Sequence, residues 1–268
     1  DSAPTAFRIR DIQSEEELDA FVEMQKDTWG RTFSDIVPSS MLQISAKMGG
    51  VVAGAFDEHD VLMGLVYGIT GLRGGSLAHW SHMLAVRPEA RNRGVGRALK
   101  LYQKQQLLTA GVKVMYWTFD PLVSRNAHLN LNRLGAEVDE YVPDMYGQSD
   151  SELHRLGTDR FIVRWALDAP VPSGTRAEGL DASVPRLLPR APSGEATWPD
   201  RDTVAVGIPP DIEAVEADAF ETALAWRTHT RSAFLHYLGQ GHRVTGFVPG
   251  GDHGFYVLSA RPTSEEPT

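Results

Sequence analysis

In the stretch Met83-Leu84-Ala85-Val86-Arg87-Pro88-Glu89-Ala90-Arg91-Asn92-Arg93-Gly94-Val95-Gly96-Arg97-Ala98-Leu99, an apolar run passes through a basic turn with two glycines into a helical pattern. Gly94 and Gly96 let the backbone come close to a ligand, because no Cβ stands in the way. The helix that follows directs its positive N-terminal end at the same place. The stretch therefore predicts an anion site, and a phosphorylated ligand is our first hypothesis.

Two other phosphate-binding motifs do not fit this spacing. A P-loop requires Gly-x-x-x-x-Gly-Lys-Ser/Thr, which the turn lacks, and a dinucleotide-binding fingerprint requires a third glycine where this chain has Leu99. A glycine pair before a helix can also be a plain turn. The basic side chains around the glycines favour the anion site over that alternative: Arg91, Arg93 and Arg97.

The spacing Arg91-x-x-Gly94-x-Gly96 resembles the coenzyme A signature, Arg/Gln-x-x-Gly-x-Gly/Ala, of the GNAT acyltransferase superfamily. The resemblance implies that the loop amides hold the pyrophosphate of acyl-CoA and that the preceding strand pairs with the pantetheine arm. It implies these coenzyme-binding residues: Leu84, Ala85, Val86, Arg91, Asn92, Arg93, Gly94, Val95, Gly96 and Arg97. The donor it implies is acetyl-CoA or another acyl-CoA such as succinyl-CoA, and no metal ion is expected.

The composition limits the possible functions. With 268 residues, of which 42% are hydrophobic and 23% charged, the chain can form one large or two modest globular domains. A net charge of −9 argues against a nucleic-acid partner. The absence of cysteine excludes disulfides, thiolate metal sites and an S-acyl enzyme intermediate. The chain shows neither a leader pattern nor about 18 consecutive apolar residues, so we expect a cytoplasmic protein without a membrane partner.

Periodicity predicts an α/β domain over residues 6–167. Ser14 and Glu17 form a capping box at the start of a helix that ends near Trp29. The expected strands are 6–12, 51–56, 61–70, 76–86, 112–119, 136–142 and 159–167, and the further helices are 38–47, one that starts at Val95 and 126–134. This order matches the GNAT topology, which implies a mixed, mostly antiparallel, splayed sheet flanked by helices.

A second region follows a linker. Residues 168–202 contain six of the chain's 16 prolines and are predicted to be the linker. A strand at 203–208, a helix at 211–238 and a hairpin at 242–248 and 254–260 predict a small α/β unit over 203–262. The helix places its large side chains at three- and four-residue steps, which indicates packing against the sheet or against a second subunit in a homodimer: Trp226, Arg227, Arg231, Phe234 and Tyr237.

Three residues are candidates for the chemistry. His82 is the candidate base, with Ser81 as a relay, because a histidine titrates near neutral pH. Two-residue alternation places His82 with Trp80 and Leu84 on one face, and places Ser81 on the other with His79 and Met83. Asp120 follows a strand and is expected to hold an ammonium substrate or orient a water. The alternatives are a half-buried histidine without a role and a strand-end turn residue.

A second segment, Asn126-Ala127-His128-Leu129-Asn130-Leu131-Asn132-Arg133-Leu134-Gly135, resembles another GNAT motif. The resemblance places Leu131 where the family usually has the tyrosine that protonates the departing thiolate. Either no general acid is needed, or Tyr141 or Tyr146 takes its place. Asn126 and Asn130 lie four residues apart and are candidate coenzyme ligands, with an N-cap as the alternative role of Asn126.

These observations predict an acyl-CoA-dependent N-acyltransferase. It would move an acetyl or succinyl group to the primary amine of a small molecule, with an amino acid as one candidate, by direct attack in a ternary complex. The alternative is a non-catalytic acyl-CoA-binding module whose C-terminal unit recruits a partner.

Overall fold

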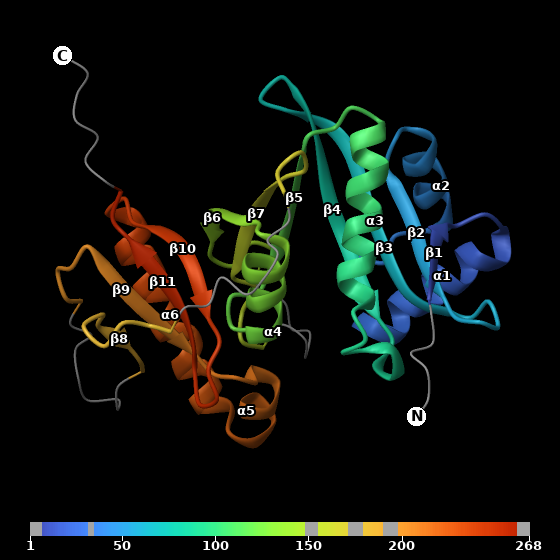
Figure 1. Cartoon of the computed structure of the whole chain (residues 1–268). Coiled ribbons are helices and arrows are strands. Elements are labelled where there is room, and N and C mark those ends of the chain that lie inside the picture. The colour runs from blue at the N-terminus through green and yellow to red at the C-terminus, as the bar shows by residue number, and fades with distance from the viewer. Residues whose placement is uncertain (1–6, 32–34, 148–154, 171–178, 190–197, 262–268) are drawn as a thin grey trace, which may run out of the picture. The chain divides into compact units, whose positions relative to one another are not determined.

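The computed structural model describes residues 7–31, 35–147, 155–170, 179–189 and 198–261 (Figure 1). The chain forms two compact units. Unit 1 comprises Asp1–Trp117 and Arg164–Pro170, and unit 2 comprises Thr118–Val163 and Val171–Thr268.

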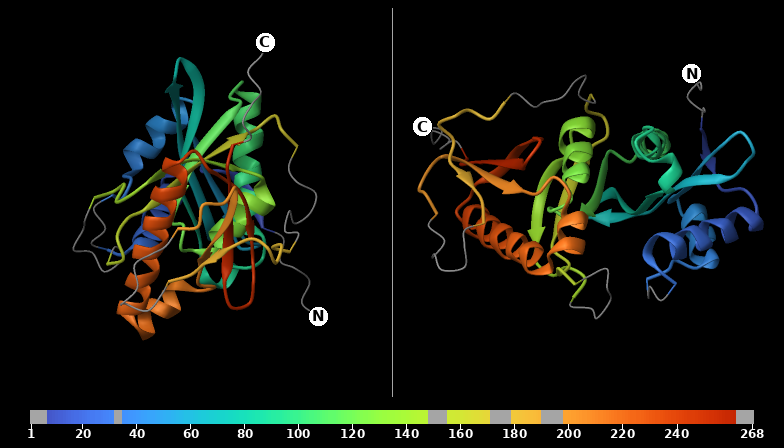
Figure 2. Two further views of the ribbon diagram at one scale, coloured as in Figure 1. Left: turned by 90° about the vertical axis from the view of Figure 1, so that its left-hand side faces the viewer. Right: turned by 90° about the horizontal axis from the view of Figure 1, so that it is seen from below.

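Unit 1 is a sheet with helices on both faces. Its elements are β1 (Arg8–Asp11), α1 (Glu15–Trp29), α2 (Ser39–Lys47), β2 (Val51–Phe56), β3 (Leu62–Arg73), β4 (Ser76–Val86), the 3₁₀ turn η1 (Pro88–Ala90) and α3 (Val95–Thr109). The sheet has the order β1-β2-β3-β4-β5-β7-β6, in which β5 (Val114–Phe119) and β7 (Arg160–Ala166) each contribute residues to both units. Helices α1 and α2 cover one face and α3 covers the other (Figures 1 and 2).

The start of α1 confirms the predicted cap. Ser14 has an extended backbone, and its side chain accepts a hydrogen bond from the Glu17 N–H at 3.3 Å. The Glu17 carboxylate in turn accepts from the N–H of Gln13 and pairs with Arg10 at 2.7 Å. Local residues alone supply most of this cap, which explains why the sequence predicted it.

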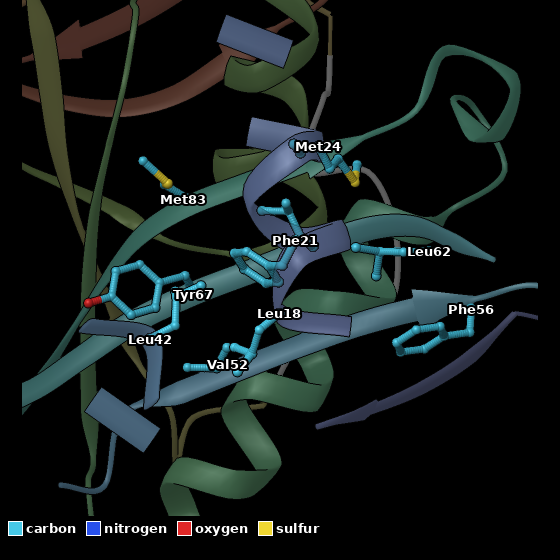
Figure 3. Packing of buried hydrophobic residues seen from close by; sticks show 11 residues of the cluster. Leu18, Phe21, Met24, Leu42, Val52, Phe56, Leu62, Tyr67 and Met83 are labelled. Atoms are coloured by element: carbon cyan, nitrogen blue, oxygen red, sulfur yellow. The ribbon is translucent and has the colours of Figure 1, made fainter. Parts of the chain in front are cut away.

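The core of unit 1 lies between the sheet and α1 and α2 (Figure 3). Phe21 and Leu42 are completely buried on the two helices, and Tyr67 meets them from β3. The other members are Leu18, Met24, Val52, Phe56, Leu62, Leu65, Met83 and Ala85. Since burial of each large apolar side chain contributes about 2 kcal/mol, this cluster holds the helices on the sheet.

Strand β4 carries a one-residue bulge. It pairs antiparallel with β3, but Tyr67 faces Met83 while Gly68 faces Ser81, which leaves His82 as the extra residue. Regular alternation placed Met83 on the face of Ser81, and this prediction is wrong. Met83 belongs to the core cluster on the α1 and α2 side, whereas Ser81 bonds to a side chain of α3.

Strands β4 and β5 separate soon after they meet. They are parallel and, within the described residues, pair only at His79 with Met115 and at Trp80 with Tyr116. The part of β4 that follows, from Ser81 to Val86, therefore has backbone groups on its β5 side that this pair does not satisfy. A separation of this kind is what the predicted splayed sheet requires.

Unit 2 combines the chain after Trp117 with the C-terminal elements. It contains α4 (Ser124–Ala127), the π-helix η2 (His128–Leu134), β6 (Glu137–Val142), β8 (Arg186–Leu187), β9 (Thr203–Ile208), α5 (Ile212–Asp218), α6 (Phe220–Gly239), β10 (Arg243–Val248) and β11 (Gly254–Ser259). Strands β8–β11 form a second sheet in the order β10-β11-β9-β8, with α6 along one face (Figure 2).

Three local predictions need correction here. The single helix expected over 211–238 is broken at Ala219, whose φ of −149° and ψ of 87° are not helical. The helix expected over 126–134 starts at Ser124 and becomes a π-helix at His128. Within the expected linker, residues 186–187 form β8 because they pair with β9, while residues 171–178 and 190–197 lie outside the described part.

A cluster of packed aromatic side chains explains why unit 2 combines these elements. Phe161 of β7 is completely buried and contacts Tyr141, Phe234 and Tyr256 with ring centroids 4.8–5.5 Å apart. These residues come from β6, α6 and β11, so the C-terminal elements share one core with β6 and β7. The compact units consequently do not follow the boundaries expected from the linker, and the extent of the GNAT-like domain stays a prediction.

Charged side chains surround the same core. Arg227 of α6 pairs with Asp120 at 2.5 Å and donates from Nε to the Leu156 carbonyl at 2.9 Å. Arg231, one turn later, pairs with Asp144 at 2.8 Å and also with the buried Asp159. The face of α6 that the sequence predicted to pack against another element is therefore buried within unit 2.

We expect Asp159→Asn to destabilise the protein by about 3 kcal/mol at pH 7, because it removes one member of a buried ion pair. Burial raises the pKa of Asp159, but hydrogen bonds from Arg231 and Tyr141 outweigh burial and lower it. A lowered native pKa means that this stabilisation is present above about pH 4 and is lost as the pH falls further. Denaturant unfolding of both proteins at pH 7 and pH 3 checks this.

The exposed pair of Arg8 and Asp60 provides the control. Asp60→Asn should change stability by less than about 1 kcal/mol, since exposed ion pairs contribute little. Equal stability of Asp159→Asn and wild type at pH 7 would contradict the role given to Asp159.

Candidate functional site

The basic turn between η1 and α3 has the backbone that an anion loop needs. Gly94 is the N-cap of α3 and is left-handed, with φ of 78°, and Asn92 also has a positive φ of 60°. A residue with a Cβ reaches this region only with strain. The turn from Arg91 to Gly94 is exposed.

The first turn of α3 has unused hydrogen-bond donors. Its first helical bond runs from the Ala98 N–H to the Gly94 carbonyl at 3.0 Å, and Gly94 has no side chain to act as a cap. The N–H groups of the residues between them have no acceptor within the helix. The Nε of Arg97 is buried and has no hydrogen-bond partner among the described residues. These donors suit a phosphate-type anion.

The structure brings the turn and the end of β4 together. Arg91 donates from Nε to the Val86 carbonyl at 3.3 Å. A Cβ placed on Gly96 would lie 3.5 Å from Leu84 Cδ2, so Leu84 faces α3, while Ala85 points into the core cluster. The structure therefore places the predicted coenzyme-binding residues 84–86 next to the turn 91–97, although Ala85 and Val95 themselves are buried.

A buried polar chain lies farther along β4. The Nζ of Lys100 donates to Ser81 Oγ at 2.7 Å, and Ser81 donates to Gln103 Oε1 at 2.9 Å. Gln103 Nε2 lies 2.9 Å from His79 Nε2, and His79 Nδ1 lies 2.9 Å from Thr70 Oγ1. Thr70 donates to the Gly49 carbonyl at 2.7 Å. Lys100, Ser81, Gln103 and His79 are all buried.

The partners determine the direction of every bond in this chain. Gln103 donates with its amide nitrogen, so Nε2 of His79 is the acceptor and Nδ1 carries the proton. Burial lowers the pKa of His79 to about 3, with a further contribution from the charge of Lys100, so the ring is neutral. The position of the ring depends on Gly68, where a Cβ would come within 2.2 Å of His79 Nε2.

Lys100 is the most unusual charged group of unit 1. Burial lowers its pKa from 10.5 to about 7, and no acidic group of the described residues offsets this effect. Its Nζ lies 4.1 Å above the ring centre of Trp117, which stabilises a cation. At neutral pH this lysine is therefore close to the point where it gains or loses its proton.

The three predicted catalytic residues lie in different surroundings. His82 is the exposed bulge residue, and its ring meets the Tyr67 ring edge-on with the two ring centroids 6.0 Å apart. Desolvation lowers the pKa of His82, and the negative charge of Asp35 offsets part of this shift. Ser81 is a neighbour of His82 in sequence, but its hydroxyl belongs to the buried Lys100 chain.

Asp120, in unit 2, serves its own turn and α6. Its carboxylate accepts from the Leu122 N–H at 2.8 Å and from Arg227 at 2.5 Å, and Arg160 lies 3.6 Å away. These contacts give Asp120 a structural function in unit 2. Each carboxylate oxygen therefore already accepts one hydrogen bond, which an ammonium group or a water would have to share.

The two predicted asparagines lie in unit 2. Asn126 is inside α4, whose N-cap is Val123, so the N-cap alternative for Asn126 is wrong. Asn130 is buried in the π-helix, where its carbonyl accepts from the Ala136 N–H at 2.9 Å. Because the helix type changes at His128, the four-residue spacing no longer places both side chains on one α-helical face.

The two tyrosines considered as replacements for Leu131 differ in their surroundings. Tyr141 is partly buried and donates its hydroxyl proton to Asp159. Burial and this hydrogen bond raise its pKa far above the ordinary value, so it is a poor acid. Tyr146 is exposed, and its hydroxyl lies 3.0 Å from Thr118 Oγ1.

Sequence reasoning missed Lys100 and Gln103. A signal was present, because both polar residues fall on the core-facing stripe of α3 with Val95, Leu99 and Leu107. A long polar residue on such a stripe can also lie at its solvent edge. Only the packing of α3 on β4 distinguishes the two cases.

No group of three metal-binding side chains is present in the residues the structure covers. In the same residues, no helix is sufficiently long and apolar to cross a membrane.

We expect Lys100→Met to stabilise the protein below pH 7, because the wild type buries an ammonium group that has no acidic partner. The native pKa of about 7 lies below that of the unfolded chain, so wild-type stability should rise with pH from about 7 to 10 and approach that of the variant. Denaturant unfolding at pH 6 and pH 9 measures both.

Lys104→Met is the matched control, since Lys104 lies on the same helix and 5.1 Å above Trp165 but is only half-buried. Its effect should be smaller at either pH. The burial argument would be contradicted if the wild type were more stable than Lys100→Met at pH 6 and the difference in stability were the same at pH 9.

Comparisons with solved structures identify the fold. A scan of protein-family models and a search of curated proteins found no match. An N-acetyltransferase from Staphylococcus aureus Mu50 is 12% identical, with TM-score 0.50 over 61% of this chain and 100% of its own. A provisionally assigned acetyltransferase from Acinetobacter baylyi ADP1 is 17% identical, with TM-score 0.50 over 62% and 96%. A GNAT superfamily phosphinothricin acetyltransferase from Sinorhizobium meliloti, in complex with acetyl-CoA, is 16% identical, with TM-score 0.49 over 66% and 94%. The predicted fold class is confirmed: the chain has the fold of the GNAT acetyltransferases.

Proposed function

We propose that the protein is an acyl-CoA-dependent N-acyltransferase. The observation that carries the proposal is the loop at the N-terminus of α3, where a left-handed Gly94, free helical N–H groups and the unpaired Nε of Arg97 meet the end of β4. The solved acetyltransferases named above support the same fold, and one of them is a complex with acetyl-CoA.

The loop fits a pyrophosphate. Donors at the start of α3 and the basic side chains of the turn would bind its oxygens. The section of β4 that does not pair with β5 offers extended backbone groups, and the pantetheine arm carries two amides that bind such groups. The arm would follow Leu84, Ala85 and Val86, and the thioester carbonyl at its far end would lie near the Ser81 end of β4, where a backbone N–H polarises it.

His82 is our candidate for removing a proton from the attacking amine. As the bulge residue of β4, it is exposed close to the predicted position of the carbonyl. Its lowered pKa keeps the imidazole neutral at pH 7, which a base requires. Ser81 is not placed to relay this proton, since its own hydrogen goes to Gln103.

The proposal specifies the acyl donor and the acceptor by chemical class. Acetyl-CoA is the expected donor, with succinyl-CoA as the alternative, and the acceptor is the primary amine of a small molecule, with an amino acid as one candidate. The competing hypothesis is a non-catalytic acyl-CoA-binding module, and the specific observation in its favour is the Leu131 side chain at the usual tyrosine position. Release of thiol with a panel of amines supports the enzyme, whereas binding without release supports the module.

We expect Gly94→Val to reduce affinity for acetyl-CoA more than 10-fold. A β-branched residue at φ 78° would force the loop out of the conformation that presents its N–H groups. Isothermal titration with acetyl-CoA measures this loss.

The matched control is Gly96→Ala, because a Cβ there meets its nearest atoms at ordinary contact distance, 3.5 Å and 3.9 Å. This variant should bind within a few-fold of the wild type. Unchanged affinity in Gly94→Val would remove the coenzyme loop from the proposal.

We expect His82→Gln to lower kcat about 100-fold with little change in KM for acyl-CoA, because the variant lacks the proton acceptor. The defect should shrink at higher pH, where more of the amine substrate is already neutral. Steady-state kinetics over pH 6–9 measures both effects.

His59→Gln changes an exposed histidine in the β2–β3 turn and should leave kcat unaltered. If His82→Gln and His59→Gln are equally active, His82 is not the base.

A further inference from the structure

Within the described residues of unit 1, the Lys100 chain is a buried polar cluster that the proposed function leaves unexplained. The Lys100 ammonium group has three N–H donors. One of them donates to Ser81, and the ring face of Trp117 attracts the positive charge. No carboxylate of the described residues compensates the charge. A buried charge of this kind is costly to stability, so the fold retains it at an energetic disadvantage.

Lys100 lies next to the point at which β4 stops pairing with β5. Ser81, its hydrogen-bond acceptor, directly follows Trp80, the last residue of β4 that pairs with β5. Trp117, its second neighbour, directly follows Tyr116, the last paired residue of β5. The Nζ of Lys100 therefore lies on the α3 side of the sheet at the point where the two strands separate.

The distance from the coenzyme loop matches an extended pantetheine arm. Val86, which binds the turn through Arg91, is five residues beyond Ser81, or about 16 Å along an extended strand. From phosphate to sulfur, a pantetheine arm has about as many backbone bonds as four peptide residues and spans about 14 Å when extended. An arm that follows β4 from the loop thus brings its sulfur close to Lys100.

We propose that Lys100 is the group that receives the departing coenzyme A thiolate and protonates it. The inference rests on the proposed N-acyltransferase function. It also accounts for Leu131, since a lysine on α3 would do the work of the usual tyrosine from a different element.

The step balances in atoms and electrons. The amine nitrogen forms a C–N bond with the thioester carbon, and the C–S bond breaks with its electron pair on sulfur. The sulfur takes a proton from the Lys100 ammonium, and the proton released by the amine passes to His82 and then to solvent. Lys100 regains a proton from solvent, so that acyl-CoA and amine become amide and free coenzyme A.

The surroundings suit this task. An ordinary thiol has a pKa of about 8.5, so an ammonium group with a pKa of about 7 is strong enough to protonate its thiolate. The groups that face Lys100 are Ser81 on β4, Trp117 on β5 and, beyond Ser81, Gln103 and the neutral His79. None of them is an anion that would hold the proton back. Because Ser81 donates to Gln103, it can only accept from Lys100, and this directs the amine without competing for its proton.

The test uses coenzyme A itself as the probe. The ultraviolet absorbance of the thiolate reports the thiolate fraction of coenzyme A bound to the wild type, Lys100→Met, Lys100→Gln and the control Lys104→Met. Below pH 7, where Lys100 is charged, the bound thiol should form more thiolate in the wild type and Lys104→Met than in both Lys100 variants. Well above pH 7, where Lys100 is neutral, this difference should disappear.

Turnover provides the second measurement. With acetyl-CoA and an amine that the wild type acylates, kcat of Lys100→Met and Lys100→Gln should fall about 100-fold with KM for acetyl-CoA little changed. Wild-type kcat in either variant, or a thiolate fraction below pH 7 equal to that of the wild type while coenzyme A still binds, overturns the assignment of Lys100 alone. Failure of the wild type to bind coenzyme A overturns the proposed function as well.

Discussion

The one-residue bulge at His82 is the constraint on which the arrangement of unit 1 depends. Before the bulge, His79 and Ser81 of β4 face α3 and form its buried polar chain. After it, Met83 enters the core under α1 and α2, and Leu84 takes up the contact with α3. A regular strand would keep Met83 on the face of Ser81. By shifting the register, the bulge exposes an imidazole on one side of β4 and buries a lysine on the other.

The separation of β4 from β5 gives this arrangement its chemical meaning. Paired strands satisfy each other's backbone hydrogen-bonding groups, and after Trp80 the strand β5 no longer does so for β4. A ligand with its own amides can take the place of the missing strand. The proposed anion loop at the start of α3 and the lysine beside Ser81 then lie at the two ends of one extended segment. The proposed acyl transfer uses that segment as its binding surface.

Unit 2 shows how the C-terminal region is joined to the second half of the larger sheet. Phe161 lies at the centre of a core built by β6, β7, α6 and β11. On α6, Arg227 pairs with Asp120, which follows β5, and Arg231 pairs with Asp159, which precedes β7. Asp120, which the sequence suggested for the chemistry, is engaged in this ionic contact. A carboxylate at a strand end can serve a ligand or a neighbouring helix, and only the partner that arrives in the fold decides which.

The sequence by itself determined the features that depend on near neighbours. These include the Ser14 cap, the hairpins, the glycine turn before α3 and the order of elements that indicated a GNAT-like fold. Each rests on a few consecutive residues and their backbone preferences. Only the tertiary structure decided the faces of β4 around the bulge, the burial of Lys100 and Gln103, the π-helix at His128 and the partner of Asp120. These features depend on residues distant in sequence, because a bulge, a buried charge or an ion pair is defined by the strand or helix packed against it.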